Sequence, residues 1–202
     1  MQNITHLIEQ YKVVASGKVL EAYKFVLERT ESLEGLLPSQ QVSKLWNVYC
    51  QHYSQRENNL NGKLFEAILA TIMLKNGVSP IFVQAKVVFV PNVNFDFIVY
   101  SKEFGPISIS AKTSLRERYK QADLESVSLK YVHRKARCFL VTMDKEEATR
   151  LERKRINGDL LGIDEIVLGN ESSFDVMVEF LSQLNLEEPA PVQIISALKI
   201  LR

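Results

Sequence analysis

Two short segments with strand-like patterns carry an acid and a lysine that could act together. Asp96 lies near the start of segment 95–100, and Lys112 ends segment 107–112. Because side chains alternate between the two faces of a strand, a hairpin of these segments would place Asp96 and Lys112 near the same end of a sheet. Such a pair suits hydrolytic chemistry, but an ion pair on an exposed strand face would give the same pattern.

A second acid follows on a helix predicted over residues 119–133. Gln121 and Glu125 are four residues apart and share one face of that helix. The twelve residues between Lys112 and Glu125 leave room for a loop and the first helical turns, so Glu125 can turn back towards Asp96. Two carboxylates and a lysine suit hydrolysis assisted by a divalent cation, because carboxylates hold Mg²⁺ and a lysine can orient water and offset phosphate charge.

Glu66 lies inside an apolar helix predicted over residues 63–75. Its carboxylate either points to solvent from the face of the helix or supplies a further acid near the metal site.

The loop between Lys112 and Glu125 contains the triplet Arg116-Glu117-Arg118. Arginine makes bidentate hydrogen bonds to guanine, and glutamate accepts a hydrogen bond from cytosine, so the triplet matches two adjacent G·C pairs. The alternative is a solvated loop with an internal salt bridge.

Basic side chains concentrate around this triplet. Residues 112–137 contain eight basic and three acidic side chains, a net charge of +5 in a chain whose total is +1. Such a local patch suits a DNA-binding face. The candidates for phosphate contacts, which could also form a solvated helix face, are Lys120, Lys130, Arg134 and Lys135.

The pattern of Asp96, Ser110-Ala111-Lys112 and Glu125 resembles the PD-(D/E)xK nucleases in their migrated-glutamate form. In that form a small residue replaces the acid before the lysine, and a glutamate on the next helix supplies the carboxylate. Segment 111–125, with its Arg-Glu-Arg triplet, looks most like type II restriction endonucleases with a CC–GG core, the SsoII and EcoRII branch that cuts CCNGG or CCWGG. Phe95 stands where that family has a proline.

The resemblance implies a Mg²⁺-dependent enzyme that cuts double-stranded DNA as a homodimer. Its metal ligands would be Asp96 and Glu125, with Glu66 assisting and Lys112 serving the attacking water. Arg116, Glu117 and Arg118 would read bases. Gln55 would approach the minor groove at the centre of the site, although a polar residue at a helix end explains it equally well. Some relatives stack an extruded base on an aromatic ring, but the pattern around Trp46 favours helix packing.

The elements that must position these residues follow from periodicity. Helices are expected within residues 1–60, with a helix starting after the break at 36–39 and Ser39 as its cap. A turn at 58–62, the helix at 63–75, strands at 81–90, 95–100 and 107–112, and the helix at 119–133 come next. A strand at 137–143, a helix at 145–156, a strand at 163–168 and a helix at 174–184 complete the order, before a linker at 187–191 and an apolar tail at 192–201.

This order predicts an α/β fold in which an antiparallel meander is followed by crossover connections. It fits a restriction-endonuclease-like αβββαβ core with a mixed sheet flanked by helices. We expect one endonuclease domain over residues 1–202, with a catalytic core at 63–185. The helical part at 1–60 would serve dimerisation and DNA contacts, and the tail at 192–202 is a second interface candidate.

Composition limits the alternatives. The 202 residues are 46% hydrophobic and 24% charged, which excludes disordered and collagen-like classes. We expect a cytoplasmic protein without a secretory signal or membrane span, whose Cys50 and Cys138 are reduced and buried. Zinc-site spacing, a Walker loop, GxGxxG and a nucleophile elbow are absent from the sequence.

Two rival functions remain open at this point. One is a repair or structure-specific nuclease of the same superfamily. The other is a DNA-binding protein that kept the nuclease fold without its activity.

Overall fold

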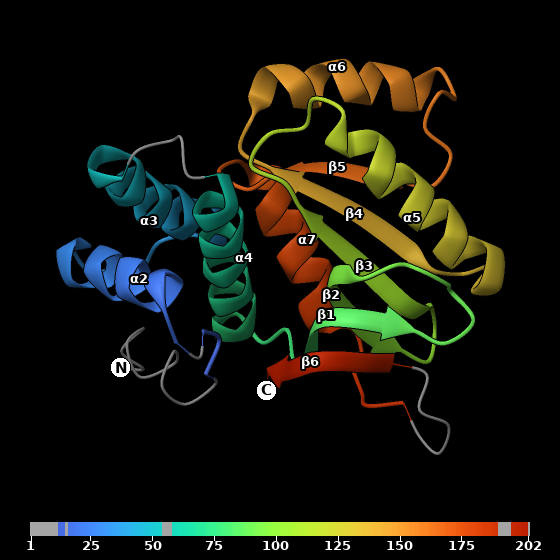
Figure 1. Cartoon of the computed structure of the whole chain (residues 1–202), viewed down its shortest axis with the longest axis horizontal. Coiled ribbons are helices and arrows are strands. Elements are labelled where there is room, and N and C mark those ends of the chain that lie inside the picture. Colours follow the sequence, from blue (N-terminus) through green and yellow to red (C-terminus); the bar gives the residue numbers. More distant parts are fainter. Residues whose placement is uncertain (1–11, 15, 54–57, 190–194, 202) are drawn as a thin grey trace.

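The structure is a computed structural model that describes residues 12–14, 16–53, 58–189 and 195–201 (Figure 1). In chain order its elements are α2 (Lys18–Arg29), α3 (Pro38–His52), α4 (Asn58–Lys75), β1 (Ile81–Val87), β2 (Phe95–Ser101), β3 (Gly105–Ala111), α5 (Arg118–Val132), β4 (Arg137–Thr142), α6 (Lys145–Ile156), β5 (Glu165–Leu168), α7 (Ser172–Gln183) and β6 (Ile195–Leu201).

The strands form one sheet in the order β5-β4-β3-β2-β1-β6. Strands β1, β2 and β3 are an antiparallel meander, whereas β3, β4 and β5 run parallel to one another. Helices α5 and α6 make the crossovers between the parallel strands, as the parallel pairing requires. The predicted α/β fold with an αβββαβ core and a mixed sheet is confirmed, with α4 as its first helix.

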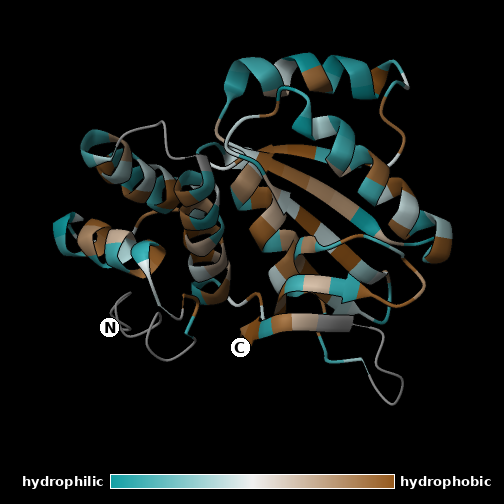
Figure 2. Cartoon of the chain, viewed as in Figure 1, coloured by the Kyte–Doolittle hydropathy of each residue, from teal (hydrophilic) through white to brown (hydrophobic). Residues whose placement is uncertain are grey.

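Helix α4 lies against one face of the sheet. Its first turns are polar, but from Leu64 to Leu74 it is apolar on nearly all sides, because other elements enclose it there (Figure 2). Its Phe65, Ile68 and Ile72 belong to a buried cluster that also includes side chains of α2, α3, α7 and strands β2 to β5. This large core holds α4 against the sheet, and Glu66 therefore approaches Asp96 from this face.

Helix α5 covers the opposite face. Leu129 of α5 packs in a cluster with Phe82, Ile98 and Cys138 of the sheet. Ser108 lies on the same face of the strand as Lys112, four residues earlier, and it is buried on this side. The strand face is therefore covered by a helix along most of its length, and the alternative of an open, solvated face is wrong.

Two helix starts differ from the sequence prediction. Residues 58–62, predicted as a turn, form the first turns of α4, because its tertiary packing outweighs the turn preference of Asn and Gly. Helix α3 begins at Pro38 with Leu37 as its N-cap, and proline suits the first helical position. Ser39 lies inside the first turn, where its amide and hydroxyl both donate to Asp175 of α7 at 2.7 Å.

The C-terminal segment also differs from the prediction. Residues 195–201 of the predicted apolar tail form β6, which pairs antiparallel with β1 from Ile81–Leu201 to Val87–Ile195. Strand β6 is therefore an edge of the sheet. Cys138 is buried as predicted, whereas Cys50 is only half-buried, and both are free thiols. Among the described residues, no helix is long and apolar enough to cross a membrane.

Candidate active site

Asp96 and Lys112 meet where β2 begins and β3 ends. Lys112 Nζ donates to Asp96 Oδ2 at 2.7 Å, and the two side chains are only 15% and 12% exposed. The hydroxyl of Ser110 and the amide of Ala111 donate to the same oxygen at 3.2 and 2.9 Å. Three donors therefore fix Oδ2, while Oδ1 accepts no hydrogen bond from the part of the chain that the structure describes.

Glu66 reaches the same place from α4. Burial, together with the negative charge of Asp96, raises the pKa of Glu66 to about 7, against the opposing effect of Lys112. Glu66, Asp96 and Lys112 line a common cleft of about 950 Å³. Glu66 therefore lies near the acid–lysine pair.

Gln84 also belongs to this group, although no sequence pattern had indicated it. Its neighbours Val83 and Ala85 pair with Phe97 and Phe95, so Gln84 lies opposite Asp96 in the β1–β2 ladder. The Gln84 amide donates to Glu66 Oε2 at 3.2 Å, and its carbonyl accepts from Asn94 at 2.7 Å.

The backbone of Gln84 has a φ of +49°, which is rare for a residue with a side chain. Residues in such conformations gather at functional sites, where surrounding contacts hold them. No sequence signal marks this conformation, because it depends on the pairing of β1 with its neighbours.

Glu125 approaches from α5. Burial raises the pKa of Glu125, the hydrogen bond from Gln121 at 2.7 Å and the charge of Lys112 lower it, and the charge of Asp96 raises it further. The charges of Asp96 and Lys112 therefore both act on the carboxylate of Glu125. The structure brings three of the four predicted catalytic residues, Glu66, Asp96 and Lys112, into one cleft. Glu125 does not line that cleft, and its hydrogen-bond partner is Gln121.

The donor set fits a hard divalent cation such as Mg²⁺. Carboxylate oxygens are its preferred ligands. Partial burial and the charge of Asp96 disfavour the ionised forms of Glu66 and Glu125, and a bound cation would compensate their negative charge. In the described residues, no three His, Cys, Asp or Glu side chains form a complete metal site.

The predicted base-reading residues lie on the loop that joins β3 to α5. Arg116, Glu117 and Arg118 are all exposed. Arg118 lines the same cleft as Lys112. The loop therefore begins at the acid–lysine pair, and Arg118 borders the approach to that pair.

A carboxylate outside the loop fixes it in place. Glu147 of α6 accepts hydrogen bonds from the backbone amides of Leu115 and Arg116. The sequence identified neither this contact nor Glu147, because more than thirty residues separate the partners and the glutamate resembles its charged neighbours on α6.

A second cavity, of about 470 Å³, borders the loop on the side of α3. Trp46 and Tyr49 line it together with Arg116 and Arg118. The Trp46 ring also contacts Tyr49 and Phe65 at centroid distances of 5.3 Å, so it packs between helices α3 and α4 as expected. Trp46 therefore borders the arginine triplet as well as packing in the helical part.

The predicted phosphate contacts fall in two places. Lys120 lies in the first turn of α5 and pairs with Glu117, next to the base-reading loop. Lys130, Arg134 and Lys135 lie around the other end of α5, near the start of β4. The structure does not bring this second group together with the acid–lysine pair.

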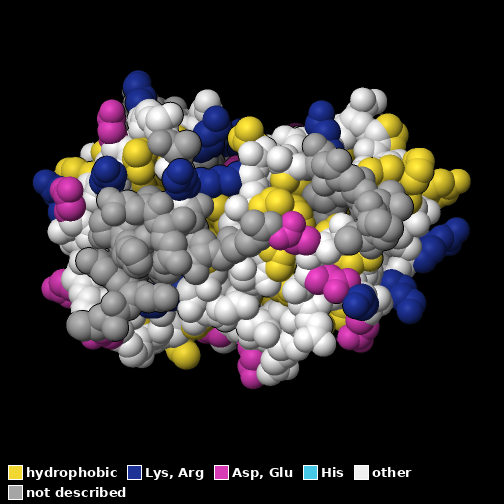
Figure 3. Space-filling model, turned by 90° about the horizontal axis from the view of Figure 1, so that it is seen from below, with side chains coloured by type: hydrophobic (Ala, Val, Ile, Leu, Met, Phe, Trp, Pro, Cys, Tyr) yellow, Lys and Arg dark blue, Asp and Glu magenta, His cyan; other side chains and the backbone are white. Residues whose placement is uncertain are grey.

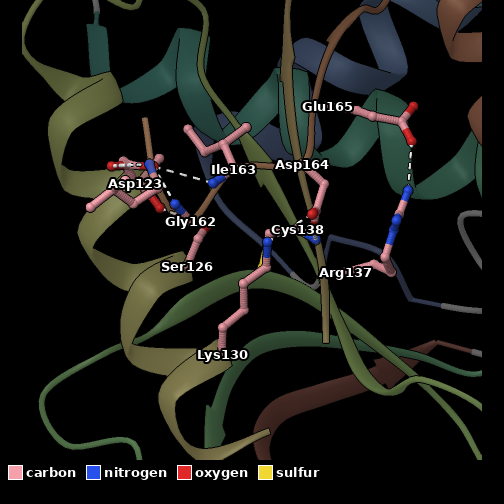
Figure 4. A network of polar contacts seen from close by, with 11 residues as sticks. Asp123, Ser126, Lys130, Arg137, Cys138, Gly162, Ile163, Asp164 and Glu165 are labelled. Carbon is pink, nitrogen blue, oxygen red and sulfur yellow. Dashed lines mark hydrogen bonds and ion pairs between the residues drawn. The ribbon is translucent and has the colours of Figure 1, made fainter. Parts of the chain in front are cut away.

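Lys130 has a partner within the fold (Figure 4). Its ammonium donates to Asp164 Oδ1 at 2.7 Å, and Asp164 Oδ2 accepts from the amide of Cys138 at 2.8 Å. Both charged side chains are less than a quarter exposed. Lys130 therefore ties α5 to β4 and β5, and its predicted contact with phosphate stays a prediction.

Gln55 lies outside the described residues, so its predicted place near the minor groove is not described. The space-filling view shows basic side chains at both ends of the face towards β6, and acidic side chains both between them and beside the basic group at the left end (Figure 3).

Comparisons with known proteins give one informative match. A solved complex of the restriction endonuclease PspGI with substrate DNA is similar over 93% of this chain and 83% of that chain, with 20% sequence identity and a TM-score of 0.52. No protein-family model matches the chain. A search of curated proteins also gave no match. The chain therefore has the fold of that restriction endonuclease.

Proposed function

We propose that this protein is a type II restriction endonuclease that hydrolyses phosphodiester bonds of double-stranded DNA with Mg²⁺. The observation that carries the proposal is the partly buried Asp96–Lys112 pair, with Glu66 in the same cleft, shortly before an exposed Arg-Glu-Arg triplet. The charges of Asp96 and Lys112 also act on Glu125 of α5. The restriction-endonuclease fold supports it.

In the proposed mechanism, Asp96 and Glu125 hold the cation, and Glu66 supports it from α4. When bound, Mg²⁺ polarises a phosphoryl oxygen and activates the attacking water. The Lys112 ammonium is anchored by Asp96, so it can orient the water and stabilise negative charge that develops on the phosphate. The water oxygen would bond to phosphorus and lose a proton to the surrounding water, while the bond from phosphorus to the leaving oxygen breaks and that oxygen takes a proton from water.

The proposed specificity is a palindromic site with a CC–GG core, of the CCNGG type. Arg116 and Arg118 would each bind a guanine, and Glu117 would accept from cytosine. Lys120, Arg134, Lys135 and Lys130 are proposed phosphate contacts, and Gln55 a minor-groove contact. A palindrome implies a two-fold homodimer with one active site for each strand.

The first test is digestion of a plasmid by the purified protein with Mg²⁺. We expect discrete fragments, and Asp96→Ala, Lys112→Ala and Glu125→Ala should each lower the rate by about 10²–10⁴-fold. Lys102→Ala is the matched control for the lysine, because Lys102 is 82% exposed and lies in the β2–β3 turn.

Each rival function gives a different result in that digestion. A repair or structure-specific nuclease would leave intact plasmid uncut and cut only damaged or branched DNA. A DNA-binding protein without activity would retard duplex DNA and cut none. Full activity of Glu125→Ala would refute the migrated-glutamate assignment even if the protein is a restriction enzyme.

A further inference from the structure

The loop that carries the arginine triplet is held by a carboxylate from another part of the chain. Glu147 Oε2 accepts from the amide of Leu115 at 2.6 Å, and both Glu147 oxygens lie within 3.2 Å of the amide of Arg116. Charge-assisted hydrogen bonds of this kind are shorter and stronger than neutral ones. Two consecutive amides bound by one carboxylate fix the direction of the backbone immediately before the triplet.

Glu147 is itself held rigidly. It lies in the first turn of α6, where its amide donates to the N-cap residue Asp144 at 3.0 Å. The amide of Asp144 in turn donates to the hydroxyl of Thr142, the last residue of β4. Because a carboxylate near a helix N-terminus interacts favourably with the helix dipole, the site of Glu147 also suits its charge.

Strand β4 thereby controls both ends of the segment between Lys112 and Arg116. The amide of Lys112 donates to the carbonyl of Val141 of β4 at 2.9 Å. At the other end, Arg116 is bound by Glu147, which follows β4 by a few residues. The distance between the lysine and the arginine is thus set by one rigid strand and the helix after it.

The backbone of Arg116 needs such support. Its φ is +21°, at the edge of the left-handed region, which residues with side chains rarely adopt. Strained residues of this kind persist where their surroundings hold them. The hydrogen bond from the Arg116 amide to Glu147 is a direct restraint on this conformation.

We infer that Glu147 is a positioning residue for sequence recognition, which holds Arg116 and Arg118 at a fixed offset from the Asp96–Lys112 pair. This inference rests on the proposed function. Glu147 touches no DNA in this account; it acts through the loop backbone. Loss of Glu147 should therefore impair discrimination between sites more than it impairs binding to DNA of any sequence.

The test compares Glu147→Ala and Glu147→Gln with Glu146→Ala. Glu146 is the adjacent glutamate of the same helical turn, and its side chain is 87% exposed. Each variant digests a sequenced plasmid with Mg²⁺, and sequencing of the ends counts breaks at the wild-type sites and at all other positions. Affinity for a random duplex is measured beside it, because a general folding defect would lower both quantities.

For Glu147→Ala we expect the preference for wild-type sites to decrease by a factor of about 5 to 150, which is the equivalent of one arginine–guanine contact. The affinity for random duplex should not change. Glu147→Gln keeps one oxygen acceptor and should fall between Glu147→Ala and the wild type. Glu146→Ala should match the wild type.

Hydrogen exchange gives a readout that needs no activity. The amides of Leu115 and Arg116 should exchange slowly in the wild type and faster in Glu147→Ala without DNA. Unchanged site preference in a variant with fast-exchanging amides would overturn the inference, as would unchanged exchange. A wild-type protein that cuts no duplex would instead refute the proposed function, while the exchange result would still report on the hydrogen bonds of Glu147.

Discussion

At the scale of single residues, the negative charges of the acids in the candidate site repel one another. Glu66 lies beside Asp96 in a partly buried cleft, so its ionised form is disfavoured in the folded protein. Asp96 is compensated by its ion pair with Lys112. Glu66 accepts a hydrogen bond from Gln84, and the charges of Lys112 and Lys63 offset only part of the effect of burial and of Asp96. This arrangement costs folding free energy and prepares the site for a cation.

The pH dependence of stability follows from the pKa of Glu66, which rises from an ordinary 4.5 to about 7 on folding. Below pH 4.5 Glu66 is protonated in both states and carries no penalty. As the pH rises towards 7 the unfolded state ionises first, so the folded state loses stability by an amount on the order of 3 kcal/mol, which is complete above pH 7.

Glu66→Gln removes that penalty and keeps an acceptor for Gln84. We therefore expect the variant to be more stable than the wild type, by a margin that grows between pH 4.5 and 7 and is constant above pH 7. Urea unfolding across this range measures the margin. A margin that does not change with pH would contradict the proposed environment of Glu66.

The sequence predicted the meeting of Asp96 and Lys112 because both lie on neighbouring strands with clear alternation. It predicted the approach of Glu125 from helical spacing and loop length. Gln84 and Glu147 could not be predicted in this way. The role of Gln84 depends on a positive φ within a strand, and that of Glu147 on a contact between distant segments.

At the scale of elements, α5 connects the two parts of the candidate site. Its first residue is Arg118, the last residue of the arginine triplet, and it also carries the half-buried Glu125. The loop before β5 holds this helix, because Asp123 of α5 accepts hydrogen bonds from the amides of Leu161, Gly162 and Ile163 (Figure 4).

Gly162 allows this close approach. A methyl group at Gly162 would collide with the backbone of α5 at Asp123 and Val127. Gly162→Ala should therefore lower the free energy of unfolding by about 1–3 kcal/mol, measured by urea denaturation.

Gly62→Ala is the contrasting variant, because Gly62 lies within α4 and a methyl group there meets no atom within 4 Å. It should be neutral or raise stability by up to about 1 kcal/mol through helix propensity. Equal effects of the two substitutions would show that α5 does not pack on this loop as described.

The order of helices and strands was predictable because most elements have a consistent hydrophobic period. The exceptions have a common cause. The start of α4 has a turn-like composition that its packing overrides, and β6 pairs with a strand more than a hundred residues earlier in the chain. Neither effect has a local signal in the sequence.

At the scale of the whole molecule, the candidate active site and the arginine triplet are adjacent. Only three residues separate Lys112 from Arg116, which limits their Cα atoms to about 14 Å even in a fully extended chain. Each subunit of a two-fold dimer should therefore cut next to the base pairs that it reads. The nicks are then expected at the 5′ edges of the CC–GG core, leaving 5′ overhangs that span the site.

Sequencing the ends of plasmid DNA digested with Mg²⁺ tests this account most directly, with Lys112→Ala as the inactive control. We predict breaks at one short palindrome with a CC–GG core, 5′ overhangs that span it, and no breaks above background with Lys112→Ala. Blunt ends, 3′ overhangs, breaks far outside the recognised sequence, or equal cutting by Lys112→Ala would contradict the placement of the active site beside the base-reading loop.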